Sequence, residues 1–182
     1  MLKKICLPVV LLLSITVAAQ TTPDKHVVAM QHMMMKLIMA APGNFANIKG
    51  AQESQQGNAV FYKANLAATV SDPAEMKEAL ANDFFGAMQT ADDHIVVTPE
   101  GTIYLARYID DAEFSITGMV IQAFTTLPAN AGKAGADTKL EKIPGSITEQ
   151  FVYIFIINSS IVAKLNCDTK AGTAALIIGV KK

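Results

Sequence analysis

The sequence predicts an α+β fold in which two helices pack on an antiparallel sheet of about six to seven strands. Three observations lead to this prediction. Two segments carry apolar residues at helical spacing, each behind an N-capping residue. Short runs rich in β-branched and aromatic residues are separated by turn residues. The last of these runs follow one another without a helix between them, which favours antiparallel pairing.

The first helix is expected over Asp24–Ala41. Thr22 or Asp24 can cap it, and Pro42-Gly43-Asn44 ends it. Its apolar side chains recur at helical spacing and are expected to face the core: Val27, Met30, Met34, Leu37 and Ala41. The polar segment Ala51–Gly57 beyond this helix is predicted to be a surface loop.

The second helix has a stronger start signal. Asp72-Pro73-Ala74-Glu75 places an Asp at the N-cap, a Pro at the first helical position and a Glu at the third, which is a capping-box arrangement. The helix is expected to end near Gln89. Its apolar stripe consists of Met76, Ala79, Leu80, Phe84, Ala87 and Met88.

The sheet is predicted from the remaining apolar runs. Thr98-Pro99-Glu100-Gly101 has turn chemistry and joins two of these runs as a hairpin. The long segment Pro128–Gly145 is predicted to be a connection without strands, and no internal repeat is recognisable. The expected strands are Asn58–Ala67, Ile95–Val97, Thr102–Ile109, one within Glu113–Thr126, Glu149–Ile157, Ile161–Cys167 and Thr173–Val180.

One part of an expected strand, Phe151–Ile157, is apolar at every position. A strand that is apolar on both faces is covered on both faces or lies at an interface. Because the two helices cover one face of the sheet, the other face is expected to meet a second protomer, a partner or a ligand. The alternative is that Pro128–Gly145 folds back over it. Phe151, Tyr153 and Phe155 are therefore the candidate residues for binding a ligand or partner.

Residues Met1–Ala19 have the pattern of a secretory signal peptide: a basic start, an apolar run over Ile5–Val17 and small residues before Gln20. We expect cleavage before Gln20 and a periplasmic or extracellular protein whose residues 20–182 form a single α+β domain. The apolar run is shorter than the about 20 residues of a membrane span, and no second such run follows. No transmembrane segment is therefore expected after cleavage.

The composition of residues 20–182 excludes several classes of protein. Cys167 is the only cysteine left, so an intrachain disulfide cannot form, and its position in the strand predicts that it faces the core. Loss of Lys3 and Lys4 takes the formal net charge from −1 to −3. With one arginine, Arg107, and no basic stripe, the chain lacks the features of a nucleic-acid-binding protein.

An acidic cluster is the candidate metal site. If the hairpin turns near Pro99-Glu100, cross-strand partners have numbers that sum to about 200, and acidic residues of both strands meet at one end of the sheet. Their oxygens suit Ca²⁺ or Mg²⁺, and a pair of carboxylates suits hydrolysis by acid–base catalysis. The alternative is two solvated loops in which Arg107 neutralises one carboxylate. The candidate ligands are Asp92, Asp93, Asp110, Asp111 and Glu113.

The sequence carries no catalytic motif: G-x-S-x-G, H-E-x-x-H and C-x-x-C are all missing. No cofactor is expected. We expect an exported, non-catalytic protein that binds a ligand or a protein partner, or associates with itself. Two alternatives stay open, a small-ligand or lipid carrier that uses a helix–sheet groove and a hydrolase that uses the acidic cluster.

One segment resembles a group of known proteins. In Met34–Gly50, the residues Asn44-Phe45-Ala46-Asn47-Ile48-Lys49-Gly50 follow an apolar helix, and the signal ends in Ala18-Ala19-Gln20. Both features resemble small uncharacterised secreted proteins of Gram-negative bacteria. The resemblance covers about a tenth of the chain; it implies no activity and transfers no functional residue.

Overall fold

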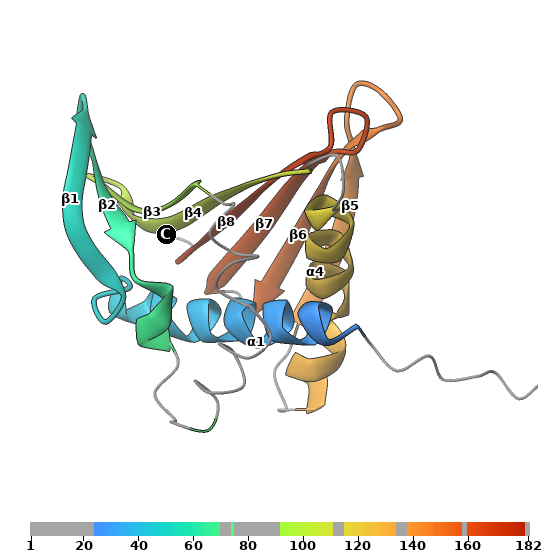
Figure 1. Cartoon of the computed structure of the whole chain (residues 1–182), viewed down its shortest axis with the longest axis horizontal. Coiled ribbons are helices and arrows are strands. Elements are labelled where there is room, and N and C mark those ends of the chain that lie inside the picture. The colour runs from blue at the N-terminus through green and yellow to red at the C-terminus, as the bar shows by residue number, and fades with distance from the viewer. Residues whose placement is uncertain are drawn as a thin grey trace, which may run out of the picture.

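Eight antiparallel strands form one sheet in the computed structural model, which describes residues 24–69, 74, 92–110, 115–133, 138–157 and 160–180. Their order in the sheet is β1-β2-β3-β4-β8-β7-β6-β5 (Figure 1). The described helices are α1 (Lys25–Ala40) and α4 (Ile116–Lys133), with 3-10 turns at Ala41–Gly43 and Leu66–Thr69. The strands are β1 (Lys49–Gln56), β2 (Ala59–Ala64), β3 (Asp92–Thr98), β4 (Gly101–Ile109), β5 (Thr138–Pro144), β6 (Gln150–Ile157), β7 (Ile161–Asp168) and β8 (Thr173–Val180).

The α+β class predicted from the sequence is confirmed, and the predicted number of strands is wrong because the sheet has eight. Six of the expected strands correspond to β2, β3, β4, β6, β7 and β8. The predicted second helix, from Asp72 to near Gln89, lies outside the described residues except for Ala74. Among the described helices, none is both long enough and apolar enough to cross a membrane.

The two halves of the sheet follow the same plan. In each half a helix is followed by four strands: α1 precedes β1 to β4, and α4 precedes β5 to β8. The halves meet where β4 pairs with β8, the last strand of each half. Since β4 and β8 run antiparallel, an approximate two-fold axis between them relates the two sets of four strands. No repeat is recognisable in the sequence, so the repetition is one of topology.

Both helices pack on one face of the sheet, which we call the inner face. Figure 1 shows α1 crossing under the strands and α4 standing beside β6. Successive side chains of a strand point to opposite faces. On β4, Tyr104, Ala106 and Tyr108 are fully buried, whereas Arg107 and Ile109 are exposed. Inner-face residues of β4, β6, β7 and β8 form one core with the helices. We call the opposite face the outer face; none of the described helices packs on it.

Helix α1 begins and ends close to its predicted bounds. The carboxylate Oδ1 of Asp24 accepts a hydrogen bond from the backbone N–H of His26 at 2.8 Å and so caps the helix. At the other end, Asn44 has a φ of 52°, and this left-handed residue helps to turn the chain toward β1. The predicted apolar stripe is confirmed, since each of its members is at most 2% exposed: Val27, Met30, Met34, Leu37 and Ala41.

The prediction of a surface loop over Ala51–Gly57 is wrong, because Lys49–Gln56 forms β1. Every residue of β1 is exposed. This strand lies at the edge of the sheet, and a polar, exposed edge strand has no apolar alternation by which the sequence could reveal it.

The predictions for Glu113–Thr126 and Pro128–Gly145 are also wrong. The first contains no strand among its described residues, because Ile116–Lys133 forms α4. Its many β-branched residues favour a strand by propensity, and packing of an apolar stripe against the sheet outweighs that preference. The stripe is Ile116, Val120, Ala123, Phe124 and Leu127. The segment predicted as a strand-free connection continues α4 past Pro128 and then supplies β5.

Met34 and Met39 provide a matched test of the inner face, because both are methionines of α1. Met34 is 0% exposed and Met39 is 75% exposed. We expect Met34→Ala to lower the free energy of unfolding in urea by about 2–5 kcal/mol, since it leaves a cavity. Met39→Ala is expected to change it by less than about 0.5 kcal/mol. Equal effects of the two substitutions would show that α1 does not bury the stripe assigned to it.

Candidate functional site

A hollow of about 530 Å³ lies where β4, β8, β7 and β6 run side by side. Its walls come mainly from two neighbouring rows of the outer face. In the first row Arg107 lies opposite Ala175, which lies opposite Asn166, which in turn lies opposite Val152. The second row is Ile109, Thr173, Asp168 and Gln150. The register of four strands therefore brings polar and apolar side chains together around one space.

Arg107 is the arginine that lines this hollow, and it is the only one in the chain. Its side chain is exposed and makes no hydrogen bond or ion pair within the described ranges. A guanidinium is always charged and offers five N–H donors in a planar fork. The positive charge of Arg107 is therefore available to a molecule that enters the hollow.

The other polar side chains of the hollow differ in the hydrogen bonds that they make within the protein. Gln150 Nε2 donates to Asp168 Oδ2 at 2.9 Å, and the backbone N–H of Ala171 donates to Asp168 Oδ1 at 2.9 Å. These hydrogen bonds, that of Gln150 above all, lower the pKa of Asp168 and keep it ionised. Asn166 makes no side-chain hydrogen bond within the described part of the chain. It lies two strands from Arg107, about 10 Å away, and its amide is free to contact a ligand.

The structure places Phe151, Tyr153 and Phe155, the residues singled out for binding, on the inner face of β6. Phe155 is fully buried, and the rings of Tyr153 and Phe155 each lie 6.4 Å from the ring of Phe124 on α4. Phe151 also lines the hollow. The ammonium group of Lys142 lies over its ring, 4.1 Å from the ring centre, in a cation–π contact. Two of the three aromatic residues thus pack against a helix, and the third borders the hollow.

The outward side chains of β6 are Val152, Ile154 and Ile156, and all three are partly exposed. The described part of Pro128–Gly145 does not fold back over them, because it belongs to α4 and to β5, which extends the sheet beside β6. The apolar outer face anticipated from the sequence is therefore present, and none of the elements that the structure describes lies across it.

The described members of the predicted metal site, Asp92, Asp93 and Asp110, are not brought together. Asp92 and Asp93 follow one another in β3 and point to opposite faces. Asp110 caps α4: its Oδ1 accepts from the backbone N–H of Thr117 at 2.7 Å and its Oδ2 from the hydroxyl of Ser115 at 3.1 Å. Asp111 and Glu113 lie outside the described residues. Over the ranges that are described, no group of three or more His, Cys, Asp or Glu side chains can hold a metal ion.

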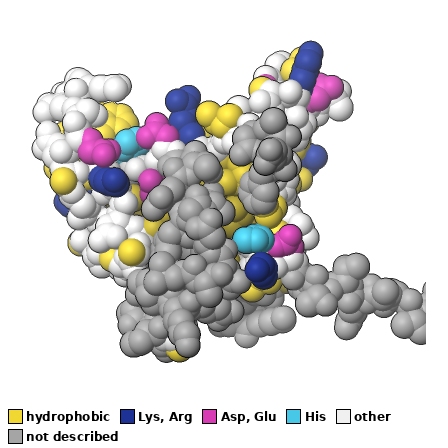
Figure 2. Space-filling view, in the orientation of Figure 1, with side chains coloured by type: hydrophobic (Ala, Val, Ile, Leu, Met, Phe, Trp, Pro, Cys, Tyr) yellow, Lys and Arg dark blue, Asp and Glu magenta, His cyan; other side chains and the backbone are white. Residues whose placement is uncertain are grey.

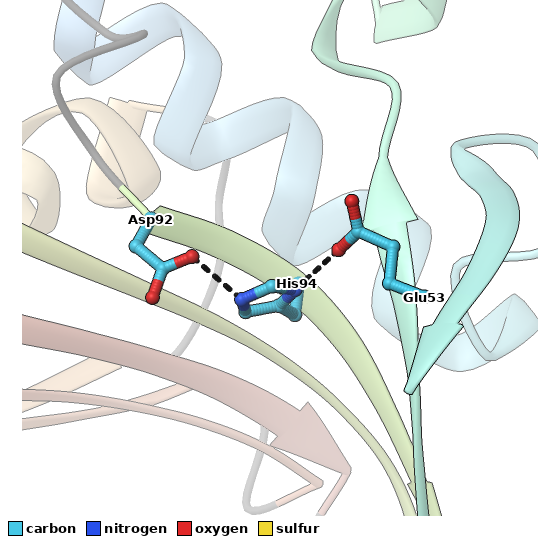
Figure 3. A network of polar contacts seen from close by, with 3 residues as sticks. All are labelled: Glu53, Asp92 and His94. Atoms are coloured by element: carbon cyan, nitrogen blue, oxygen red, sulfur yellow. Dashed lines mark hydrogen bonds and ion pairs between the residues drawn. The ribbon is translucent and has the colours of Figure 1, made fainter. Parts of the chain in front are cut away.

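Asp92 belongs instead to a network with His94 and Glu53 (Figure 3). His94 Nε2 lies 2.7 Å from Asp92 Oδ1, and His94 Nδ1 lies 3.0 Å from Glu53 Oε2. The ring of Phe61 meets the imidazole edge-on at 5.8 Å. Figure 2 shows a histidine flanked by acidic side chains, with basic side chains nearby, at the upper left of the molecule over β1 to β3. The network joins β1 to β3 across β2.

Asp93 points to the inner face, opposite Ala106 and between Tyr104 and Tyr108. Its Oδ2 and both phenol oxygens are buried and have no hydrogen-bond partner. Burial raises the pKa of Asp93 to about 6 and the pKa of both tyrosines well above their usual value. Because the carboxyl is partly shielded from water and its Oδ2 has no hydrogen-bond partner, an ionised Asp93 costs the folded state free energy.

Asp93→Asn tests this cost. The folded-state pKa of about 6 lies above the ordinary value of 3.8, so wild-type stability is greatest below that ordinary value and is lost as the pH rises through about 6. We expect the substitution to raise the free energy of unfolding at neutral pH by about 1–3 kcal/mol, and to change it little near pH 4. Urea denaturation at both pH values measures the effect. A stability difference that does not change with pH would contradict it. Glu149→Gln serves as the control, because it alters an exposed carboxylate that makes no side-chain hydrogen bond with the described residues.

Sequence reasoning missed Arg107 and Asn166 as binding residues. The sequence shows Arg107 as the only arginine, but the role expected for it was to neutralise an aspartate. Glu53 was not recognised, because its segment was predicted to be a loop.

No family model, no curated protein and no solved structure matches the chain. The function of the protein therefore has to be inferred from the hollow and the charged residues beside it.

Proposed function

We propose that the chain is an exported, non-catalytic binding protein that holds a small ligand with an acidic group in the hollow of the outer face. One observation carries the proposal: the exposed guanidinium of Arg107 lines the hollow and has no partner among the described residues. Guanidinium groups bind carboxylates, sulfonates and phosphates through paired, charge-assisted hydrogen bonds. The free amide of Asn166 in the same row adds a second polar contact.

The apolar side chains around Arg107 support a ligand that also has an apolar part. Ala175 lines the hollow next to Arg107 in the sheet, Ile109 lies two residues along β4, and Val152 lines the far side on β6. Its volume of about 530 Å³ falls within the range of small-molecule sites, about 300–1,000 Å³. Beyond it the outer face continues with partly exposed Ile154 and Ile177, which lie on either side of the exposed Lys164. An organic acid with an apolar tail matches this surface, and we therefore propose the sheet face as the ligand site in preference to a helix–sheet groove.

The ionisable groups of the hollow favour binding over catalysis. General acid–base catalysis works best with a pKa near the working pH. Burial raises the pKa of the Cys167 thiol to about 12 and raises that of Tyr108 further. Hydrogen bonds lower the pKa of Asp168. A hydrolase based on the acidic cluster has less support, because its described members point in different directions.

Export is the part of the proposal that rests on residues Met1–Ala19. Their basic start, apolar run and small residues before Gln20 form a signal-peptide pattern. A chain cleaved there carries its ligand in the periplasm or outside the cell. The resemblance of Met34–Gly50 to small secreted proteins of Gram-negative bacteria supports the same location.

Binding of anilinonaphthalene sulfonate, a fluorescent anion with an apolar ring system, tests the proposal. We expect Arg107→Gln to weaken its binding at least about tenfold, because a charge-assisted contact of about 1.5–3 kcal/mol is lost. Decanoate should displace the probe from the wild-type protein, and decanol, which lacks the charge, should displace it less well. Fluorescence titration gives all three affinities.

Lys25→Gln is the matched control, because it removes one positive charge from an exposed side chain of α1, away from the outer face. It should leave the affinity for the probe unchanged. Urea denaturation should show that Arg107→Gln folds with nearly wild-type stability, since Arg107 is exposed. Equal affinity of the wild-type and Arg107→Gln proteins would overturn the proposal.

A further inference from the structure

Strand β5 ends the sheet on the side opposite β1, as Figure 1 shows. Its residues pair with β6 in an unbroken register, and its other edge pairs with no described strand. A regular edge strand offers unpaired N–H and C=O groups to another strand. The opposite edge is less suitable, because the register of β1 shifts twice along its pairing with β2, and such bulges protect an edge.

The hairpin between β5 and β6 shows which backbone groups point away from the sheet. The N–H of Gly145, the residue after β5, donates to the carbonyl of Gln150 at 2.7 Å. Residues of an antiparallel strand bond to their partner strand alternately, so the odd-numbered residues of β5 bond to β6. The outward N–H and C=O groups, which have no backbone partner in the described ranges, belong to the even-numbered residues Thr138, Leu140 and Lys142.

The side chains along this edge carry one charge of each sign on the outer face. Lys139 and Glu141 form an ion pair with each other there, and their side chains are 69% and 40% exposed. Lys142 points to the inner face, where its ammonium group lies over the ring of Phe151. Leu140, also on the inner face, packs against the core. An edge with this pattern is complementary to a second copy of itself.

We propose that β5 pairs antiparallel with β5 of a second copy of the chain, about a two-fold axis that runs perpendicular to the sheet beside Leu140. In this register Lys139 lies opposite Glu141 of the second copy, and Glu141 lies opposite its Lys139. The backbone groups of Thr138 meet those of Lys142, so that each outward N–H finds a carbonyl. Opposite charges directly across two strands attract each other, and the two-fold axis closes the assembly as a dimer.

The charges favour this register over its neighbours. With the helices of both copies on one side, a shift by one residue places inner-face side chains beside outer-face ones. A shift by two residues sets Glu141 opposite Glu141 in one direction and Lys139 opposite Lys139 in the other, and like charges directly opposite are destabilising. Pro144, which has no N–H to donate, stays outside the paired segment.

The dimer extends the sheet across both copies, and their outer faces lie on the same side because the axis is perpendicular to the sheet. The outward aliphatic side chains of β6 then lie about 14 Å from those of the second copy, across the two β5 strands. Both hollows open on that side. The dimer itself rests on β5 alone, so its test is independent of the ligand proposed for the hollow.

Light scattering of the full chain over a range of concentrations measures the dimer. Small interfaces give weak complexes, so we expect a monomer at about 1 µM and a dimer as the concentration rises past about 100 µM. Glu141→Lys and Lys139→Glu each set like charges opposite one another twice, and each should weaken dimerisation at least about tenfold. Lys164→Glu is the control, because it reverses an exposed charge on the outer face of β7, two strands from the edge. It should leave dimerisation unchanged.

An equimolar mixture of Glu141→Lys and Lys139→Glu separates pairing between copies from an effect on the fold. Each variant keeps like charges side by side within its own β5, whereas across a mixed dimer every opposed pair consists of a lysine and a glutamate. The mixture should therefore dimerise about as tightly as the wild-type chain, at concentrations where each variant alone is monomeric. A mixture that stays monomeric, or a wild-type chain that is monomeric at every concentration, overturns the proposal.

Amide hydrogen exchange identifies the surface that the dimer uses. Exchange at Leu140 and Lys142 should slow as the dimer forms, because their N–H groups become hydrogen-bonded. Exchange at Ile143, whose N–H faces β6 in the monomer as well, should change little. A dimer in which Leu140 and Lys142 still exchange as fast as in the monomer uses another surface, such as the apolar outer face. Filaments in place of dimers would indicate pairing of β5 with β1, and either result contradicts the proposal.

Discussion

The pairing of β4 with β8 is the contact on which the rest of the structure depends. It joins the last strands of two halves, each made of a helix and four strands, into one sheet. The shared inner face is then wide enough for α1 and α4 to pack on it and on each other. The same pairing sets Arg107 beside Ala175 and, through β7, places Asn166 in the same row. The hollow therefore lies at the seam between the two halves.

The outer face is where charge and apolar surface meet. Along β3 and β4 the side chains of His94, Asp92 and Arg107 follow one another, while the outward side chains of β6 beyond Gln150 are aliphatic. An exposed cation next to partly exposed aliphatic side chains suits a molecule with an acidic group and an apolar part. On the inner face, one carboxylate oxygen of the partly exposed Asp93 is shielded from water and has no hydrogen-bond partner. The pKa of Asp93 is therefore raised to about 6, which links the stability of the fold to pH.

Much of the fold could be predicted from the sequence where one face of an element is buried. The stripe of α1 and the Pro-containing turn between β3 and β4 are local signals, and the observed cross-strand partners Asp92 and Arg107 have numbers that sum to 199, close to the expected 200. Helix α4 was missed because its β-branched residues favour a strand until the sheet is there to pack against. Strand β1 was missed because all of its residues are exposed. The network of Glu53, His94 and Asp92 includes that missed strand, since Glu53 comes from β1, whereas the hollow is lined by strands that were predicted.

The central claim is that the guanidinium of Arg107 holds the acidic group of the ligand. Because Arg107 is the only arginine, its Nε–Hε group contributes a single, unambiguous arginine signal to a ¹⁵N–¹H correlation spectrum. Titration with decanoate tests the contact directly. If the account is right, the Nε–Hε signal shifts and saturates together with the backbone signals of Val152 and Asn166. Saturating shifts elsewhere in the protein, with an unmoved Nε–Hε signal, would contradict it.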